Sequence, residues 1–273
     1  MLKRAIRSVL DQTYSKLECI VVDDASRDNT EGMISSFEDD RLRYFRHEKN
    51  KGASAARNTG IKHSKGELIA FLDDDDEWLS AKLEKQVPLI NGLPESVGMV
   101  YCWMDYLDEN GKTVLKHHPI LKGYVFPQLL DAQRLGGCPT LLVRRKVLDK
   151  IRGFDETLIR GNDGDFIRRV CFQYEVDFIP EVLVKVHVGH ADRISVDSSK
   201  SLRLHIQASK SRLKKFREEY NKYPEAKAKL IMDLSLTHVR LKEWKIALVY
   251  FLKIVLTLNV RINKWVLFLK KIF

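Results

Sequence analysis

The first hundred residues alternate between short apolar runs and segments with helical spacing, and this alternation constrains the fold more than any other feature. Leu17–Val22, Leu42–Phe45 and Glu67–Leu72 predict buried strands, because each is short, apolar and bounded by polar residues. Segments with helical spacing lie before, between and after these strands. The pattern predicts an α/β fold with a mostly parallel sheet and helices on both faces.

Charge divides the chain near residue 198. Residues 201–273 contain 17 Lys and Arg but 5 Asp and Glu, whereas the remainder contains 30 and 32. From about Ser198 the pattern is also helical, so we expect an α/β domain over residues 1–197 and a basic helical region over residues 198–273. A basic region of this kind favours an anionic partner such as membrane headgroups. Nucleic acid is disfavoured because no nucleic-acid-binding motif accompanies the charge.

Composition excludes several classes of protein. Hydrophobic residues make up 44% of the chain, which argues against disorder. The four cysteines lie far apart without a CxxC pair, so the sequence contains neither a zinc ribbon nor a redox motif, and a reducing cytosolic setting is expected. The longest apolar run, Ile246–Leu258, is shorter than the ~20 residues of a membrane-spanning helix.

Four consecutive carboxylates, Asp73–Asp76, directly follow the predicted strand Glu67–Leu72. Adjacent carboxylates repel one another, and a cation relieves that repulsion. Loops at the carboxyl ends of parallel strands form the ligand crevice of such sheets, and Mg²⁺ or Mn²⁺ prefers oxygen ligands. The alternative is a solvated acidic loop that caps the next helix.

Two further acidic segments occupy comparable positions. Asp23 and Asp24 end the strand Leu17–Val22, where a carboxylate can accept hydrogen bonds from a base or a ribose. An Asx turn is the alternative there. Asp163 and Asp165 precede a predicted helix and can either cap that helix or supply a general base.

Three segments in this order resemble glycosyltransferase family 2: AIRSVLDQTYSKLECIVVDDASRDNT, NKGASAARNTGIKHSKGELIAFLDDDDEW and RGFDETLIRGNDGDF. The resemblance covers roughly residues 1–190. It implies a GT-A (Rossmann-like) fold and an inverting transfer from a nucleotide sugar, with a divalent metal, Mn²⁺ or Mg²⁺, as cofactor.

The resemblance also implies roles for individual residues. Asp24 would bind the uracil ring and Asp23 would shape the nucleotide pocket. Asp75 would be the leading metal ligand, supported by Asp73 and Asp74, which also approach the ribose. Two further roles are expected: Asp163 would deprotonate the acceptor hydroxyl, and Arg57 would neutralise phosphate. His187 is a minor candidate for a metal or phosphate contact.

These roles together imply a glycosyltransferase that moves a sugar from a nucleotide-diphosphate sugar, expected to be a UDP-sugar, to a hydroxyl of a glycan or lipid-linked acceptor. The expected setting is surface polysaccharide biosynthesis, such as capsule or O-antigen, in the cytoplasm or peripherally on the inner face of the plasma membrane.

The chain departs from the family pattern at its start. Family members usually begin with an apolar strand before the helix that opens this chain, and its loss leaves neighbouring strand edges with unpaired backbone groups. Either the natural chain starts upstream, or the protein is an N-terminally truncated, inactive remnant or partner subunit. A nucleotidyltransferase is disfavoured because no glycine-rich nucleotide loop is visible near the start.

The basic region contains two apolar segments. Trp244–Leu258 has enough apolar residues for a helix buried against its neighbours. Asn263–Phe273 combines aromatic residues with lysines, which is typical of an interfacial amphipathic helix or of a helical hairpin packed on the first domain.

Overall fold

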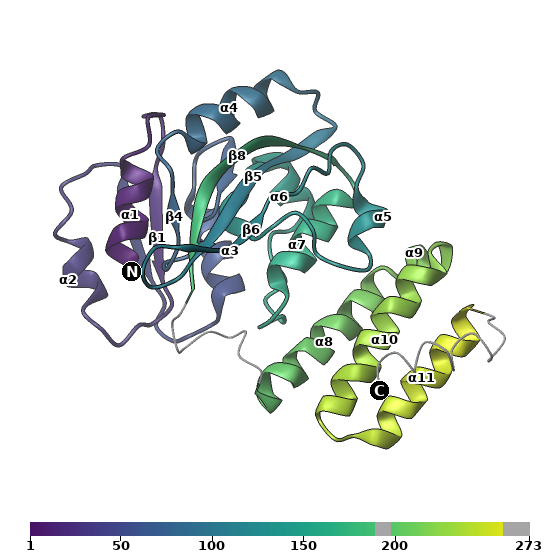
Figure 1. The fold of residues 1–273 in the computed structure, drawn as a ribbon. Helices are drawn as coiled ribbons and strands as arrows, with labels where there is room; N and C mark the ends of the chain where they lie inside the picture. The colour runs from purple at the N-terminus through teal and green to yellow at the C-terminus, as the bar shows by residue number, and fades with distance from the viewer. Residues whose placement is uncertain (189–197, 259–273) are drawn as a thin grey trace. The chain divides into compact units, whose positions relative to one another are not determined.

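The computed structural model describes residues 1–188 and 198–258 (Figure 1). The chain divides into two compact units: Met1–Phe126 with Gln133–Ala191, and Pro127–Ala132 with Asp192–Phe273. Each unit is described by itself. The site residues predicted from the sequence all belong to the first unit.

The first unit contains the predicted alternation of strands and helices, which confirms the α/β architecture. Its elements are, in chain order, α1 (Leu2–Leu10), β1 (Cys19–Asp23), α2 (Thr30–Ile34), β2 (Leu42–Arg46), α3 (Ala53–His63), β3 (Leu68–Ala70), β4 (Glu77–Trp78), α4 (Lys82–Gly92), β5 (Val97–Leu107), β6 (Thr113–His117), α5 (Phe126–Leu129, whose last residues belong to the second unit), β7 (Leu142–Arg144), α6 (Arg145–Ile151), α7 (Asn162–Cys171) and β8 (Glu175–His187).

The described strands form two sheets, one parallel and one mixed. β1 and β2 pair in parallel. β3, β7, β5, β8 and β4 form the second sheet in that order, with β6 beside β5. Its β5–β8 pair is parallel, whereas β3–β7, β4–β8, β5–β6 and β5–β7 are antiparallel. The second sheet is therefore mixed rather than mostly parallel. A short turn after Leu107 joins β5 to β6, and the other antiparallel pairs form between segments that are distant in the chain.

β1 and β3 are edge strands among the described strands. β1 pairs with β2 alone and β3 pairs with β7 alone. Each of these two strands therefore has one side that no other described strand covers.

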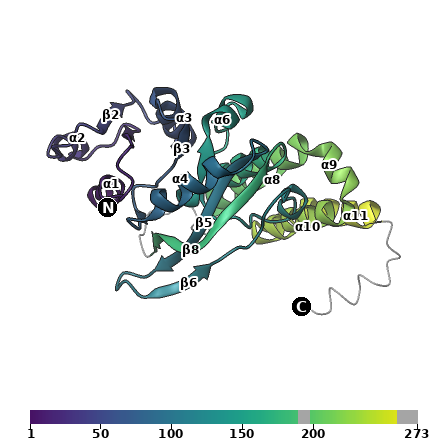
Figure 2. The same cartoon turned by 90° about the horizontal axis from the view of Figure 1, so that it is seen from above.

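A core cluster of the first unit lies between α4 and the second sheet. Leu83, Val87 and Ile90 of α4 pack with Val100 of β5 and Val184 of β8, and all five are buried. α4 lies along β5 and β8 in both views (Figures 1 and 2).

The second unit is helical. It contains α8 (Ser199–Lys215), α9 (Arg217–Lys222), α10 (Pro224–Arg240) and α11 (Trp244–Leu258). Ala228 and Ile231 of α10 and Ile254 of α11 form a small buried cluster. None of the described helices combines the length and the apolar character needed to cross a membrane. The expected interfacial segment Asn263–Phe273 lies outside the described residues.

A buried lysine is an unusual feature of the first unit. Lys82 is fully buried, and none of the described residues gives its Nζ a hydrogen-bond partner. The ammonium lies 4.0 Å from the ring centroid of Trp78, a cation–π contact. Burial lowers the pKa of Lys82 to about 8. The folded protein therefore carries a charge in an apolar environment at neutral pH, which costs stability.

Replacing Lys82 with methionine is expected to raise the free energy of unfolding at pH 7 by up to about 3 kcal/mol, the cost that a shift from 10.5 to about 8 implies. Between about pH 8 and 10.5 the folded wild-type protein releases its proton while the unfolded chain keeps it. Wild-type stability should therefore approach that of the variant as pH rises through this window. Urea unfolding of both proteins at pH 7, 9 and 10 measures the difference.

Lys85→Met provides the matched control, because Lys85 is a partly exposed lysine on the same helix that pairs with Glu181. Its stability should change by less than about 0.5 kcal/mol. A Lys82→Met stabilisation that stays constant from pH 7 to 10 would show that packing, and not the buried charge, is responsible.

Candidate active site

Arg57 joins two of the three acidic segments. Its Nη2 donates to Asp73 Oδ1 at 2.6 Å, and its Nη1 donates to Asp163 Oδ1 at 2.9 Å. The Arg57 side chain is 15% exposed, so this double ion pair is largely shielded from water. Carboxylates from the end of β3 and the start of α7 thus meet on one guanidinium supplied by α3, and the structure brings these three sequence-predicted residues together.

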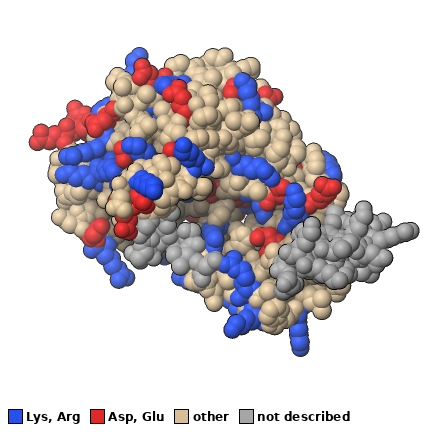
Figure 3. All heavy atoms as spheres, in the orientation of Figure 1, with Lys and Arg blue, Asp and Glu red and all other residues tan. Residues whose placement is uncertain are grey.

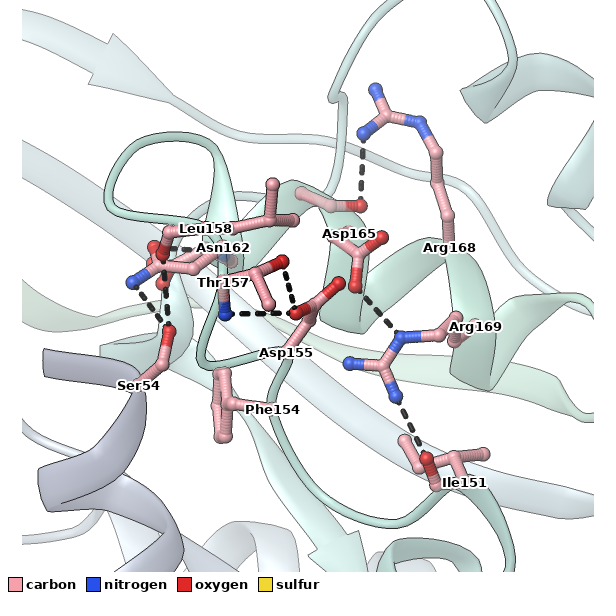
Figure 4. Close-up of polar contacts among 12 residues, drawn as sticks. Ser54, Ile151, Phe154, Asp155, Thr157, Leu158, Asn162, Asp165, Arg168 and Arg169 are labelled. Atoms are coloured by element: carbon pink, nitrogen blue, oxygen red, sulfur yellow. Dashed lines mark hydrogen bonds and ion pairs between the residues drawn. The ribbon is translucent and has the colours of Figure 1, made fainter. Parts of the chain in front are cut away.

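The loop before α7 is fastened to α3 by side-chain bonds. Asn58 donates to the carbonyl of Phe154 at 3.0 Å and accepts from its amide at 2.8 Å. Ser54 Oγ donates to the carbonyl of Leu158 and accepts from Asn162 Nδ2, both at 3.3 Å (Figure 4). Gly153 is required beside Asn58, because its φ is +63° and a Cβ there would lie 2.4 Å from Asn58 Oδ1. These contacts hold the first turn of α7, and with it Asp163, next to Arg57.

The second oxygen of Asp163 is held by a short turn. Cys138 N–H donates to Asp163 Oδ2 at 3.1 Å, from the 3₁₀ turn Cys138–Thr140. Trp78 Nε1 donates to the carbonyl of Pro139 at 2.9 Å, and Gln86 Nε2 donates to that of Thr140 at 2.9 Å. Trp78, which follows the acidic run, is buried and supports this turn. Asp163 is therefore oriented by contacts to both of its oxygens.

The electrostatics of this cluster follow from burial and close charges. Burial lowers the pKa of Arg57, but the charges of Asp73 and Asp163 outweigh it and raise that pKa far above its usual range. Burial raises the pKa of Asp73, and Arg57 opposes part of that rise. Burial raises the pKa of Cys138 well above its usual range, and Asp163 adds to the rise, so this thiol stays protonated. Arg57 is the permanent cation of the cluster.

The remaining carboxylates of the acidic run suit a hard cation. Asp74 is exposed and Asp75 is half-buried, and neither side chain has a hydrogen bond like that of Asp73 to Arg57 among the described contacts. Partial burial and the adjacent charge of Asp75 raise the pKa of Asp74, which a nearby cation would reverse.

Within the described part of the chain no group of three His, Cys, Asp or Glu side chains is placed to hold a metal ion. A pair of carboxylates nevertheless fits Mg²⁺ or Mn²⁺, which commonly take one or two protein carboxylates and complete their shell with substrate phosphates.

Asp23 and Asp24 lie at the end of β1. Asp24 Oδ1 accepts from Lys51 N–H at 2.8 Å and contacts His47 Nδ1 at 2.7 Å, while its Oδ2 accepts from Gly52 N–H at 2.6 Å. These bonds attach the strand to the start of α3. Asp23 is buried and accepts from Ser26 N–H and Tyr44 Oη, both at 2.7 Å. Each carboxylate oxygen can accept two bonds, so Asp24 keeps acceptor capacity.

His187 lies in a cationic group around Glu77. Its Nε2 is 3.3 Å from Glu77 Oε2, and Arg4 and Lys185 approach the same carboxylate at 4.0 and 3.9 Å. Burial and the charge of Arg4 lower the pKa of His187. Arg4 also donates to the carbonyl of Asp75, so this group adjoins the acidic run.

A family model described as "Glycosyl transferase family 2" matches residues 1–152, more than half of the chain. The chain belongs to glycosyltransferase family 2. This confirms the resemblance stated on the three sequence segments above.

A family 2 relative from Escherichia coli, the UDP-Glc:alpha-D-GlcNAc-diphosphoundecaprenol beta-1,3-glucosyltransferase WfgD, is 35% identical over 150 residues, which cover 53% of this chain and 55% of WfgD. The chain spans between about half and two thirds of the length of the curated relatives that it matches. The family model's match, residues 1–152, lies almost entirely in the first unit, where most of the candidate site lies.

Solved glycosyltransferase structures share the fold. S. aureus TarS 1–349 in complex with UDP-GlcNAc superposes with a TM-score of 0.63 at 16% identity, covering 94% of this chain and 85% of that one. The mannosyltransferase PcManGT from Pyrobaculum calidifontis, solved with GDP-Man and Mn²⁺, gives 0.61 at 16% identity and covers 99% and 75%. These neighbours are of the GT-A type, which confirms the predicted fold.

Proposed function

We propose that this family 2 chain transfers a sugar from a nucleotide-diphosphate sugar, a UDP-sugar, to a hydroxyl group of a glycan or lipid-linked acceptor, with inversion at the anomeric carbon. The observation that carries the proposal is the contact of Arg57 with both Asp73 and Asp163. It unites a carboxylate from the acidic run with one suited to act as a base. The names of WfgD and of the TarS complex support a UDP-sugar donor and a diphosphate-linked acceptor.

In this proposal Asp163 is the general base. Its carboxylate is held by Arg57 and by the Cys138 amide, so it can receive the proton of an acceptor hydroxyl without reorienting. The deprotonated oxygen then attacks the anomeric carbon from the face opposite the leaving nucleoside diphosphate. One displacement without an enzyme nucleophile inverts the configuration, as in inverting glycosidases.

Arg57 takes a different role from the phosphate contact expected from sequence. Both of its terminal nitrogens already bind carboxylates, so we assign it to positioning Asp163 relative to Asp73. Asp24 and Asp23 form the nucleotide end of the site, with Asp24 accepting from the uracil ring.

Asp75, supported by Asp74, would hold the divalent metal, as the Mn²⁺ in the PcManGT structure suggests for the fold. When bound, that metal supplies positive charge for the diphosphate as it leaves. Asp73, paired with Arg57, contributes at the ribose.

The remaining assignments concern the two parts of the chain and their setting. Residues 1–197 would form the catalytic domain and residues 198–273 a basic region that meets an anionic membrane. A lipid-linked acceptor would place the reaction at the cytosolic face of that membrane, in surface polysaccharide biosynthesis. The diphosphoundecaprenol in the name of WfgD supports this setting.

A thermal-shift screen of UDP-, GDP- and dTDP-sugars with Mn²⁺ or with EDTA tests the proposal. One nucleotide class should raise Tm, by an amount that corresponds to about 3 kcal/mol at a ligand concentration a hundredfold above Kd, and EDTA should remove most of this effect. Asp75→Asn is expected to abolish the metal-dependent part.

Asp40→Asn, which changes an exposed carboxylate on the loop before β2, is the matched control and should respond as the wild type does. The proposal fails if no nucleotide sugar stabilises the intact protein. If donor binding by the Asp75→Asn variant depended on Mn²⁺ as strongly as wild-type binding does, the assignment of Asp75 as the metal ligand would be refuted. The rest of the proposal would stand.

A further inference from the structure

The outer side of α11 carries large apolar side chains in contact with solvent. We call the α11 apolar face the set Trp244, Ile246, Leu248, Val249 and Leu252, which are 44–62% exposed. The opposite side of the helix contains the buried Ala247 and Ile254, and Ile254 packs with α10. The apolar residues of Trp244–Leu258 predict a helix buried against its neighbours, and the structure corrects this prediction: one side of the helix is buried and the other is exposed.

An amphipathic surface helix normally directs polar residues outward, so an outward apolar face requires an explanation. Contiguous exposed apolar patches commonly indicate a protein or membrane contact. At 15 residues α11 is about 22 Å long, less than the ~30 Å hydrocarbon core of a bilayer. The helix is therefore suited to lie on a membrane rather than to cross it.

Cations surround and interrupt this apolar face. Lys245 and Lys253 belong to the exposed part of α11. Ile246 also lines an open pocket of about 440 Å³ whose α8 side carries Arg203 and Lys210, with Arg203 paired to Glu243. Figure 3 shows blue Lys and Arg side chains on the visible surface of the second unit. Apolar side chains among cations match the chemistry of an anionic lipid surface, where lysine stems lie along the apolar region and their charges meet phosphates.

We propose that the α11 apolar face docks on an anionic lipid bilayer, with Trp244, Leu248 and Leu252 entering the boundary between headgroups and acyl chains. A second copy of the chain is a poorer occupant, because a symmetric contact would bring the lysines of both copies together. Residues 259–273 are also a poorer occupant, because they contain four Lys and Arg and no Asp or Glu. An anionic surface complements the face in charge as well as in apolar character.

Sedimentation of the full chain with vesicles tests the proposal. Vesicles that contain phosphatidylglycerol should bind the protein, and pure phosphatidylcholine vesicles should bind it at least about tenfold more weakly. The double variant Leu248→Gln with Leu252→Gln should lose about tenfold or more in affinity for the anionic vesicles, because two apolar side chains no longer enter the lipid. Glutamine leaves the net charge unchanged, so the loss reports the apolar contact.

Val114→Gln with Leu115→Gln is the matched control, since it removes two exposed apolar residues of β6. This control should bind vesicles as the wild type does. Circular dichroism and donor-induced thermal shift should be the same for all three proteins, which separates loss of docking from loss of folding and from failure of the proposed transfer.

Three results would overturn the proposal. The wild type could bind anionic vesicles no better than neutral ones. The α11 double variant could bind as the wild type does, which would assign any membrane contact to another segment. Sedimentation velocity could show that the double variant converts a dimer to a monomer without changing vesicle binding, which would make a second copy the occupant.

Discussion

Replacing Asp163 with asparagine is expected to reduce sugar transfer by about 10²- to 10⁴-fold while leaving donor affinity within about twofold. Asparagine has the same shape, and its carbonyl oxygen can still accept the bond that Cys138 N–H donates to Asp163 Oδ2. It cannot take a proton from the acceptor hydroxyl. Steady-state transfer with the donor identified by thermal shift measures kcat, and calorimetry with the same donor measures its Kd.

Asp165→Asn is the matched control. Asp165 lies in the same first turn of α7, but its Oδ2 binds Arg169 Nε at 2.7 Å (Figure 4). This change should lower thermal stability, because the ion pair is largely buried, and leave transfer nearly intact. Asp163 would be ruled out as the base if the Asp163→Asn variant still transferred sugar at the wild-type rate. It would also be ruled out if Asp165→Asn reduced transfer as much as Asp163→Asn does.

Replacing Arg57 with glutamine is expected to lower kcat by about 10²-fold or more and to destabilise the protein by about 2 kcal/mol. The change leaves Asp73 and Asp163 without the cation that joins them, so Asp163 is no longer held for proton transfer. The stability cost is smaller than for a fully buried pair, because about a third of the Asp73 side chain contacts solvent. Urea unfolding and steady-state kinetics measure the two effects.

Comparing the change in kcat with the change in donor Kd separates the two candidate roles of Arg57. A positioning role predicts a fall in kcat with donor Kd changed by less than about threefold, whereas a phosphate contact predicts weaker donor binding as the main effect. Arg57→Lys keeps the charge without the two-nitrogen geometry. It should recover most of the stability but little of the transfer. If Arg57→Gln weakened donor binding but left kcat unchanged, Arg57 would be assigned to a phosphate contact instead.

The strands that carry the candidate site were predictable because their signals are local. The segments that form β1, β2 and β3 are apolar and bounded by polar residues. A stretch of about six residues is enough to identify each of them as a strand. Strand direction was not predictable in this way, because it depends on which distant segment pairs with which. The two-residue strand β4 was missed since it has no periodicity, and β6, in which three of the five residues are exposed, lacks the apolar signal of a buried strand.

The carboxylates of the candidate site could be found from sequence, whereas the contacts that organise them could not. Asp163 and Asp73 each stand out beside a predicted element. Their connection through Arg57 spans 106 residues to Asp163, and no local pattern encodes it. Ser54 and Asn58 were overlooked for the same reason, although the polar residues at the start of α3 were a signal that this helix faces other loops.

Helix α3 limits how this chain can be re-engineered. Asp24 fixes the start of the helix, and Asn58 fixes the loop over residues 154–162 against its side. A loop transplanted from a relative will keep Asp163 within reach of Arg57 only if it retains a glycine at position 153 and a free backbone amide at position 154. Substitutions in this loop should therefore leave both of its ends unchanged, together with Glu156, whose Oε1 accepts from Asn58 Nδ2 at 2.8 Å.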